Sequence, residues 1–216
     1  MTQSIFITGT DTGVGKTYVA CRLIREYVAQ GYKVVGMKPV AAGCEWIDGQ
    51  WLNEDVALLT AASNVSAPKE FINPYCFTPP IAPHIAAEQV GVTVDMQVIK
   101  YAYDALAKLA DIVVVEGAGG LLVPLNADET IADLIQLLNL PVVLVVGLKL
   151  GCINHTALTL GAMEARAIEL KALVMNDIGN PMPAIQENIA TISNMSYAKH
   201  RINSLNNYSK AFFNQS

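Results

Sequence analysis

Apolar residues along this chain fall into short unbroken runs, separated by stretches in which they recur every three or four positions. The unbroken runs predict buried strands over residues 4–9, 33–37, 111–116, 141–147 and 171–176. Since these runs lack the polar alternation of a half-exposed strand, we expect a parallel sheet that is covered on both faces.

The stretches of helical spacing lie between the strands. They predict helices over residues 16–30, 54–62, 94–110, 130–139, 154–170 and 183–195. A polar stretch with two glycines is predicted to be a loop over 41–53, and a proline-rich one irregular over 71–83. This alternation indicates a doubly wound α/β fold, a mostly parallel sheet with helices on both faces, in a single domain over residues 1–216.

Composition excludes several classes of protein. The net charge is −5 and basic residues form no cluster, so we expect no nucleic-acid partner. The longest apolar run, 140–148, is too short to cross a bilayer, and the N-terminus lacks a charged-then-apolar leader, so we expect a cytoplasmic protein without a membrane partner. The four cysteines are scattered without a C-x-x-C pair, and we expect reduced thiols.

The first strand leads into "ITGTDTGVGKT", residues 7–17, which ends like a phosphate-binding loop. Gly13 and Gly15 allow the backbone to turn its N–H groups toward an anion. Lys16 can reach the terminal phosphates of a nucleotide, and the Thr17 hydroxyl can hold Mg²⁺.

The generic phosphate loop has a glycine at the position of Thr10. The alternative is therefore a glycine-rich turn that binds nothing. The loop nevertheless follows a strand and opens a helix, as a phosphate loop must, and this favours a nucleotide site in a fold like that of the P-loop NTPases.

Two more candidates follow the next strands. Lys38 comes directly after the second strand, where a buried ammonium needs an anionic partner unless its side chain extends to solvent. Glu116 ends the strand "DIVVVE" and would face a magnesium ion, although it could also be an ordinary acid at a strand end. The following glycines, 117–120, would bring backbone close to a ligand.

The last two strand ends carry weaker signals. Lys149 adds a cation, and Asn154 could cap the next helix, whose first amides would suit a carboxylate. Asn176 has the donor and acceptor that an adenine edge requires, although "ND" alone is typical of a turn. Spacing does not assign Asp55 to the site. It lies at a predicted helix start, where an acidic residue is common because it interacts favourably with the helix dipole.

These residues lie in blocks that resemble the dethiobiotin synthetase family. The blocks, in order, are "GTDTGVGKT", "GMKPVAAG", "NED", "NPYCF", "PHIAA", "VVEGAGGLLVPL", "LPVVLVVGLKLGCINH" and "ND". The resemblance covers residues 5 to about 177. The family's loop reads G-T-D-T-x-V-G-K-T, so it needs no glycine at position 10.

The resemblance implies an ATP-dependent ligase of biotin synthesis. Its reaction would convert 7,8-diaminononanoate and CO₂, supplied from bicarbonate, into dethiobiotin through a carbamate and a carbamic–phosphoric anhydride. ATP would be the co-substrate, Mg²⁺ the cofactor, and a homodimer the assembly.

The resemblance also implies a role for each matching residue. The catalytic residues would be Thr12, Lys16 and Lys38. The metal would be held by Thr17, Asp55 and Glu116. The nucleotide would contact Gly13, Val14, Gly15, Lys16, Thr17, Tyr18, Asp55, Glu116, Gly117, Ala118, Gly119, Asn176 and Asp177. The substrate would contact Ala42, Leu150, Gly151, Cys152 and Asn154, and the last four would border the dimer interface.

Two departures from the family pattern stand out. Ala42 occupies a position where many members have a serine whose hydroxyl faces the substrate, so one hydrogen bond would be absent. Residues 196–216 form an atypical tail without glycine or proline, where the family has a segment that touches the nucleotide.

Three other functions are compatible with parts of this pattern. A partition-type switch ATPase shares the superfold, but its signature lysine stands where this chain has Asp11. A related ligase that forms amides on another small acid would use the same two lysines. An ATP-binding relative without catalytic activity would share the loop and the altered tail.

Overall fold

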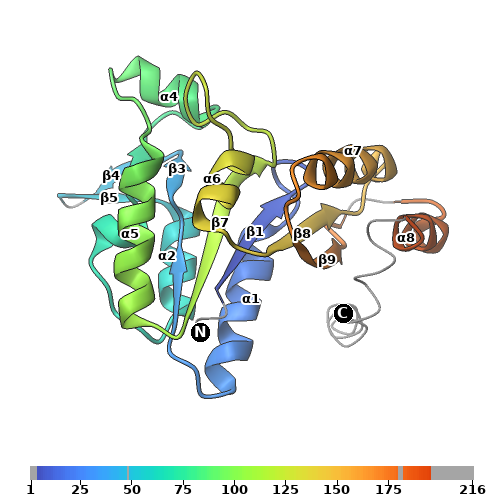
Figure 1. Cartoon of the computed structure of the whole chain (residues 1–216), viewed down its shortest axis with the longest axis horizontal. Helices are drawn as coiled ribbons and strands as arrows, with labels where there is room; N and C mark the ends of the chain where they lie inside the picture. Colours follow the sequence, from blue (N-terminus) through green and yellow to red (C-terminus); the bar gives the residue numbers. More distant parts are fainter. Residues whose placement is uncertain (1–3, 48, 180–181, 196–216) are drawn as a thin grey trace.

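The computed structural model describes residues 4–47, 49–179 and 182–195, and five parallel strands form its central sheet (Figure 1). The strands lie in the order β2-β7-β1-β8-β9. Their bounds are β1 Ile5–Gly9, β2 Val34–Met37, β7 Ile112–Gly120, β8 Val142–Gly147 and β9 Leu170–Asn176. Every predicted strand is therefore confirmed, and the doubly wound architecture follows from their order.

Alternate side chains of each strand enter two separate cores. Phe6, Val113 and Leu144 pack on one face of the sheet, and Ile7 and Val114 pack on the other. The helices against the first face are α5 (Met96–Leu109), α6 (Ile131–Leu138), α7 (Cys152–Ala165) and α8 (Ile185–Ser193). Those against the second are α1 (Lys16–Ala29) and α2 (Glu54–Ala62). Burial on both faces explains why the strands lack polar alternation.

The six predicted helices are present, although α7 ends at Ala165, before the predicted end at 170, where β9 already begins. Local capping sets the starts of α5 and α6. Asp95 accepts a hydrogen bond from the Gln97 amide at 2.7 Å, so α5 begins at Met96. Thr130 and Asp133 form a reciprocal capping box at the start of α6. These caps place the first residue of each helix within two positions of the prediction.

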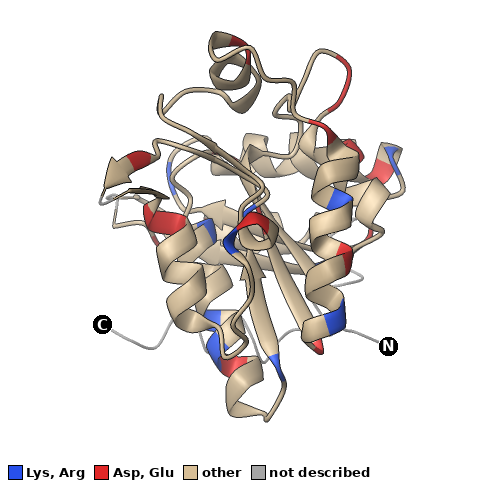
Figure 2. Cartoon of the chain, turned by 90° about the vertical axis from the view of Figure 1, so that its left-hand side faces the viewer, with Lys and Arg blue, Asp and Glu red and all other residues tan. Residues whose placement is uncertain are grey.

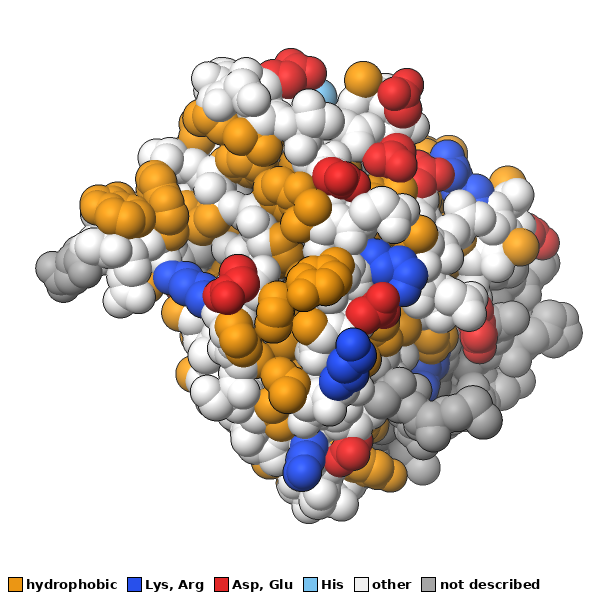
Figure 3. All heavy atoms as spheres, turned by 60° about the vertical axis from the view of Figure 1, so that its left-hand side comes forward, with side chains coloured by type: hydrophobic (Ala, Val, Ile, Leu, Met, Phe, Trp, Pro, Cys, Tyr) orange, Lys and Arg blue, Asp and Glu red, His pale blue; other side chains and the backbone are white. Residues whose placement is uncertain are grey.

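The prediction of a loop over residues 41–53 is wrong. It contains β3 (Val40–Ala42) and an antiparallel hairpin, β4 (Glu45–Ile47) and β5 (Gln50–Leu52). Trp46 and Trp51 pair across the hairpin with ring centroids 5.1 Å apart, and Figure 3 shows this hairpin projecting from the body among other exposed apolar side chains. Three-residue strands are too short to show a period.

The stretch 71–83, predicted to be irregular, also contains regular structure. It includes the end of α3 (Lys69–Ile72), β6 (Tyr75–Phe77) and the first residue of α4 (Pro83–Gln89). β6 pairs in parallel with β3, so Ala41 lies opposite Cys76. This second small sheet stands beside the carboxyl end of β2.

The expectation of four reduced thiols is wrong for two of them. Cys44 and Cys76 form a disulfide with their Cα atoms 6.0 Å apart, whereas Cys21 and Cys152 are free and buried. The two partners are 32 residues apart in sequence, and the β3–β6 pairing brings them together. Spacing alone carries no sign of this pairing.

The surface and the chain ends add two observations. On the side shown in Figure 2, the positions of basic and acidic residues are interspersed along the described ribbon and form no basic stripe. Within the described ranges, no helix is both long and apolar enough to cross a membrane. The predicted atypical tail, 196–216, lies outside the described residues.

Thiol counting tests the disulfide. Alkylation of the denatured, unreduced protein should label Cys21 and Cys152, and reduction should raise the count to all four cysteines. Removing the bridge in a Cys44→Ser/Cys76→Ser variant should lower the free energy of unfolding by about 3 kcal/mol, because the unfolded chain regains freedom. A Cys21→Ser variant is the matched control for loss of a thiol. Four labelled thiols before reduction would contradict the bridge.

Candidate active site

A pocket of about 720 Å³ opens at the carboxyl ends of β1, β2 and β7. This is the edge at which open parallel sheets bind ligands. Its lining comprises Thr12, Gly13, Gly15, Lys16, Thr17, Lys38, Val40, Ala42, Asp55, Pro80, Ile81, Ala82, Pro83, Glu116, Ala118, Gly119 and Val123. Eleven residues of the predicted site are among them, drawn together from four segments of the chain.

The loop between β1 and α1 has the shape of a phosphate cradle. Gly13 and Gly15 have φ of 70° and 87°, a left-handed conformation that glycine adopts without strain. A Cβ on Gly9 would lie 2.7 Å from Cγ2 of Val14, so the close approach that needs a glycine is at position 9. Thr10 is not among the described residues with positive φ, so its backbone does not require a glycine, and its amide donates to the Val145 carbonyl at 3.0 Å. The loop thus has a physical reason for its variant spacing.

Lys16 begins α1 and lies almost buried at the pocket wall. Its Nζ donates to the carbonyl oxygen of Asp11 at 3.0 Å. Burial, together with the nearby charge of Lys38, lowers the pKa of Lys16 to about 8. The ammonium is therefore largely protonated at neutral pH, in a place where a phosphate would stabilise it further.

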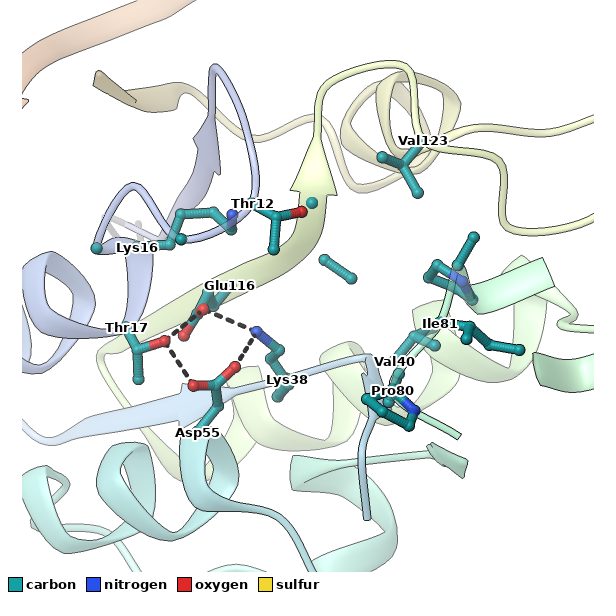
Figure 4. Close-up of a pocket in the computed structure, with 17 residues that line it drawn as sticks. Thr12, Lys16, Thr17, Lys38, Val40, Asp55, Pro80, Ile81, Glu116 and Val123 are labelled. Atoms are coloured by element: carbon teal, nitrogen blue, oxygen red, sulfur yellow. Dashed lines mark hydrogen bonds and ion pairs between the residues drawn. The ribbon is translucent and has the colours of Figure 1, made fainter. Parts of the chain in front are cut away.

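Lys38 is the centre of a buried cluster of charges (Figure 4). Its Nζ lies 2.7 Å from Oδ2 of Asp55 and 2.7 Å from Oε1 of Glu116. The Thr17 hydroxyl lies 2.8 Å from Oδ1 of Asp55 and 2.9 Å from Oε1 of Glu116. Four segments thus converge on one point: α1, the end of β2, the first turn of α2, and β7.

The two carboxylates keep Lys38 charged. Burial by itself would lower the pKa of Lys38, but Glu116 and Asp55 outweigh it and raise the pKa above its usual value. Burial would likewise raise the pKa of Asp55, but Lys38 outweighs it and lowers that pKa. The structure thus pairs Lys38 with two carboxylates of the chain itself, whereas its predicted role in binding an anionic ligand stays a prediction.

The cluster also fits a hard divalent cation. Thr17, Asp55 and Glu116 offer oxygen atoms alone, which is the ligand set that Mg²⁺ prefers. Oε2 of Glu116 is buried and has no hydrogen-bond partner among the described residues. The described residues contain no group of three or more His, Cys, Asp or Glu side chains that could hold a metal, so a cation here would need oxygens from a phosphate as well.

Asn53 places two parts of the pocket at once. Its Oδ1 accepts from the Val56 amide at 3.3 Å and caps α2, which sets Asp55 in the first turn. Its Nδ2 donates to the Ala42 carbonyl at 3.1 Å and so fixes the end of β3. Ala42 lines the pocket, and its contact with the substrate stays a prediction.

The turn between β8 and α7 differs from the prediction. α7 begins at Cys152, and Gly151 with φ of 95° occupies the cap position, so the expectation that Asn154 caps this helix is wrong. Leu150 is 95% exposed. The predicted substrate contacts from Leu150 to Asn154 lie outside the described lining of the pocket.

The predicted adenine contact lies against the phosphate loop. Nδ2 of Asn176 donates to the Val14 carbonyl at 3.0 Å. A Cβ on Gly15 would lie 2.2 Å from that same nitrogen, so a side chain there would displace Asn176. Asn176, Asp177, Tyr18, Val14 and Gly117 are not among the lining residues described above.

One wall of the pocket was missed by sequence reasoning. It consists of apolar residues from β3, from the segment that leads into α4 and that helix's first residue, and from the loop after β7: Val40, Pro80, Ile81, Ala82, Pro83 and Val123. Figure 4 shows labelled members of this wall opposite Lys16 and Thr17. The prolines between 79 and 83 mark this segment in the sequence. Their place in the pocket wall depends on the β3–β6 pairing, which the sequence does not show.

A family model and several relatives match most of this chain. A family model described as an AAA domain matches residues 3–204. A Nitrosospira multiformis protein named ATP-dependent dethiobiotin synthetase BioD is 54% identical over 192 residues, which are 89% of this chain and 83% of the relative. Proteins of the same name from Aromatoleum aromaticum and Xylella fastidiosa are 48% and 45% identical, and each alignment covers 83–88% of both chains.

Solved structures share the fold at low sequence identity. The MinC:MinD cell division complex of Aquifex aeolicus aligns at a TM-score of 0.53 with 13% identity, over 97% of this chain and 92% of the other. The kinase domain of Escherichia coli tyrosine kinase ETK aligns at 0.50 with 16% identity, over 85% and 71%. These likenesses concern the fold alone, and they confirm the predicted doubly wound, P-loop NTPase-like architecture.

The position of Lys38 predicts competition with a divalent cation. Lys38→Met should lower the thermal stability in chelator, because removing one partner of a buried ion pair costs about 3–5 kcal/mol. Millimolar Mg²⁺ should restore part of that loss, since an ion that binds only the folded state stabilises it. Thermal unfolding of both proteins, with and without Mg²⁺, is the measurement.

A Lys38→Met/Asp55→Asn variant is the control, because it removes one of the two carboxylates. Its stability should respond less to Mg²⁺ than that of Lys38→Met. An equal response of wild type and Lys38→Met would show that the ammonium and the metal do not compete.

Proposed function

The chain belongs to the dethiobiotin synthetase family, and we propose that its pocket joins 7,8-diaminononanoate, CO₂ and ATP into dethiobiotin, ADP and phosphate. The observation that carries this proposal is the placement of Lys16 and Lys38 at one pocket beside a phosphate loop. A reaction between two anions, a carbamate and a triphosphate, needs cations and backbone donors arranged in advance.

The nucleotide would bind at the loop. The amides from Gly13 to Thr17 and the α1 dipole favour phosphate there, and Lys16 would contact the terminal phosphates. Thr17, Asp55 and Glu116 would hold Mg²⁺, which screens the charge of the phosphates when bound. Asn176 lies beside the loop, near enough to serve as the proposed adenine contact.

The reaction would proceed in three steps. One amine of the substrate adds to CO₂ and loses a proton, giving a carbamate. A carbamate oxygen then attacks the γ-phosphorus, and ADP leaves with the electron pair of the broken bond. The second amine attacks the carbonyl carbon of the resulting anhydride, and phosphate leaves as the ring closes. With Asp55 and Glu116 engaged by the metal in place of Lys38, the Lys38 ammonium would be free to stabilise the negative charge of the carbamate. Thr12 would contact the phosphates from the loop.

The rest of the substrate would lie along the apolar wall. Its alkyl chain suits Val40, Ile81 and Val123. Its carboxylate would reach backbone amides around residues 150–152, which lie outside the pocket of the single chain. We therefore propose that a homodimer completes the site and covers the exposed Leu150.

The alternative of a partition-type switch has less support in this chain. Asp11 stands where such proteins have their signature lysine, and it is held by Lys149 at 2.7 Å. We propose a cytoplasmic location, where a small-molecule ligase would meet ATP. The Cys44–Cys76 disulfide is atypical of that compartment.

The direct test is product formation. The purified chain should convert diaminononanoate, bicarbonate and ATP into a ureido product of the mass of dethiobiotin, and activity should disappear in excess chelator. Each reactant is left out in turn as a control. ATP hydrolysis that proceeds equally without diaminononanoate would contradict the ligase and favour a switch ATPase.

Loss of either lysine should abolish most activity. We expect Lys16→Ala and Lys38→Ala to lower kcat by about 10²–10³, the usual effect of removing one transition-state donor. Lys108→Ala, on the exposed end of α5, is the matched control and should keep normal turnover. Near-normal turnover of Lys38→Ala in the same steady-state assay would remove it from the mechanism.

Ala42→Ser should tighten substrate binding without changing the affinity for ATP. Ala42 lines the pocket at the end of β3, beyond Lys38, and a hydroxyl there would offer a substrate amine a partner. The gain should be at most about 1.5 kcal/mol, or roughly tenfold in Kd. Calorimetric titration with each ligand measures it. A changed Kd for ATP with an unchanged Kd for diaminononanoate would place Ala42 at the wrong end of the pocket.

A further inference from the structure

An ion pair joins two loops that are far apart in sequence. Nζ of Lys149 lies 2.7 Å from Oδ2 of Asp11, across 138 positions of the chain. Asp11 belongs to the phosphate loop after β1, and Lys149 belongs to the turn after β8. These strands already pair in register, with Gly9 opposite Val145, so the sheet itself does not need the ion pair.

The Asp11 side of the contact leads into the phosphate loop. Oδ1 of Asp11 accepts from the Thr12 amide at 2.8 Å, and the Asp11 carbonyl accepts from Nζ of Lys16 at 3.0 Å. Thr12 and Lys16 both line the pocket. A shift of Asp11 would therefore move a loop amide and the ammonium that faces the phosphates.

The Lys149 side leads into the turn before α7. The Lys149 carbonyl accepts from the Cys152 amide at 3.0 Å, which closes that turn. The Leu148 amide donates to the Asn176 carbonyl at 2.8 Å, and Nδ2 of Asn176 donates back to the Val14 carbonyl at 3.0 Å. The turn and the phosphate loop are thus linked at two points, once through Asn176 and once through the ion pair.

The chemistry of the pair argues against Lys149 as a free anion ligand. Its ammonium is already neutralised by a carboxylate, and the Lys149 hydrogen bond, helped by that of the Thr12 amide, outweighs burial and lowers the pKa of Asp11. The side chains of Lys149 and Asp11 are 31% and 41% exposed. Ion pairs so exposed contribute little to folding stability, so stability is a poor explanation for this one.

We propose that the Asp11–Lys149 ion pair is a positioning device, which holds the phosphate loop at a fixed distance from the β8–α7 turn. The inference rests on the proposed function, in which the loop binds the triphosphate and the turn binds the substrate's carboxylate. The pair would then set the separation between the two ends of the site, and with it the approach of the carbamate to the γ-phosphate. Neither residue touches the reacting atoms in this role.

The test uses substitutions that remove charge and keep shape. Asp11→Asn retains an acceptor for the Thr12 amide, and Lys149→Met retains the length of the lysine. Each should lower kcat by roughly tenfold to a hundredfold, the range expected when reacting groups shift by about 1 Å. The double variant should be no worse than the poorer single one, because both remove the same contact. Lys149→Arg should recover most of the activity.

The matched control is Lys100→Met. It breaks the Lys100–Asp104 pair of α5, which has a similar contact distance of 2.8 Å and side chains 38% and 47% exposed. Neither residue is among the lining of the pocket. It should keep the wild-type kcat. All of these variants should unfold at temperatures close to that of the wild type.

Three results would overturn the proposal. Normal kcat in both single variants would show that the pair does not position the loop. Normal activity of Asp11→Asn with a raised KM for diaminononanoate in Lys149→Met would make Lys149 a direct ligand of the substrate. Losses that multiply in the double variant would show that the two residues act independently.

A separate arm distinguishes this inference from the proposed function. Calorimetric titration with ATP and Mg²⁺, without substrate, should show affinity weakened several-fold in Asp11→Asn and Lys149→Met and unchanged in Lys100→Met. If the wild type forms no ureido product, the proposed function fails while this arm still tests the coupling of Lys149 to the loop. Unchanged ATP affinity in both variants would then overturn that coupling.

Discussion

The contact between Lys38 and Glu116 is the constraint on which the site depends. Their side chains are 5% and 1% exposed, and neither charge could be buried alone without a large cost. Because Met37 lies opposite Val115 in the β2–β7 pair, the next residue on each strand comes to the same edge of the sheet. The main chain of Lys38 is held as well, since its amide donates to the Ile72 carbonyl at 2.8 Å and its carbonyl accepts from Asn73 at 2.6 Å. Strand register therefore fixes the charge cluster, and α1 and α2 bring their oxygens to it.

Most of the fold could be predicted because its strands are buried on both faces and its helices are long. A run such as 142–147 contains no polar residue, so it is identified as a buried strand without ambiguity. The predicted ends of α2 are the observed ones. The error over 41–53 has a different origin. The strands there are three residues long, and the Trp46–Trp51 contact, the disulfide and the pairing of β3 with β6 hold them in place. The disulfide and the β3–β6 pairing join segments that are far apart in sequence, so no local pattern shows them.

The charged half of the site could be predicted, and the apolar half could not. Lys16 stands in a glycine-rich loop, Lys38 follows the end of β2, and Glu116 lies on β7 where that strand passes both, so parallel topology brings the three together. The wall around Ile81 reaches the pocket through the β3–β6 pairing, which no pattern announces. The Asp11–Lys149 contact was hidden for the same reason: each residue was visible as a charge, but the direction of a side chain on a turn depends on the turn.

The two lysines of the pocket have pKa values shifted in opposite directions by their surroundings. Burial disfavours the charge of both, yet the pKa of Lys38 is raised and that of Lys16 is lowered to about 8. The difference lies in their partners, because Lys38 contacts two carboxylates whereas Lys16 donates to a carbonyl oxygen and is repelled by Lys38. The charge of Lys38 is thus compensated within the chain, and that of Lys16 is not. An incoming triphosphate would relieve this imbalance by raising the pKa of Lys16, so the electrostatics of the pocket favour an anion at the loop.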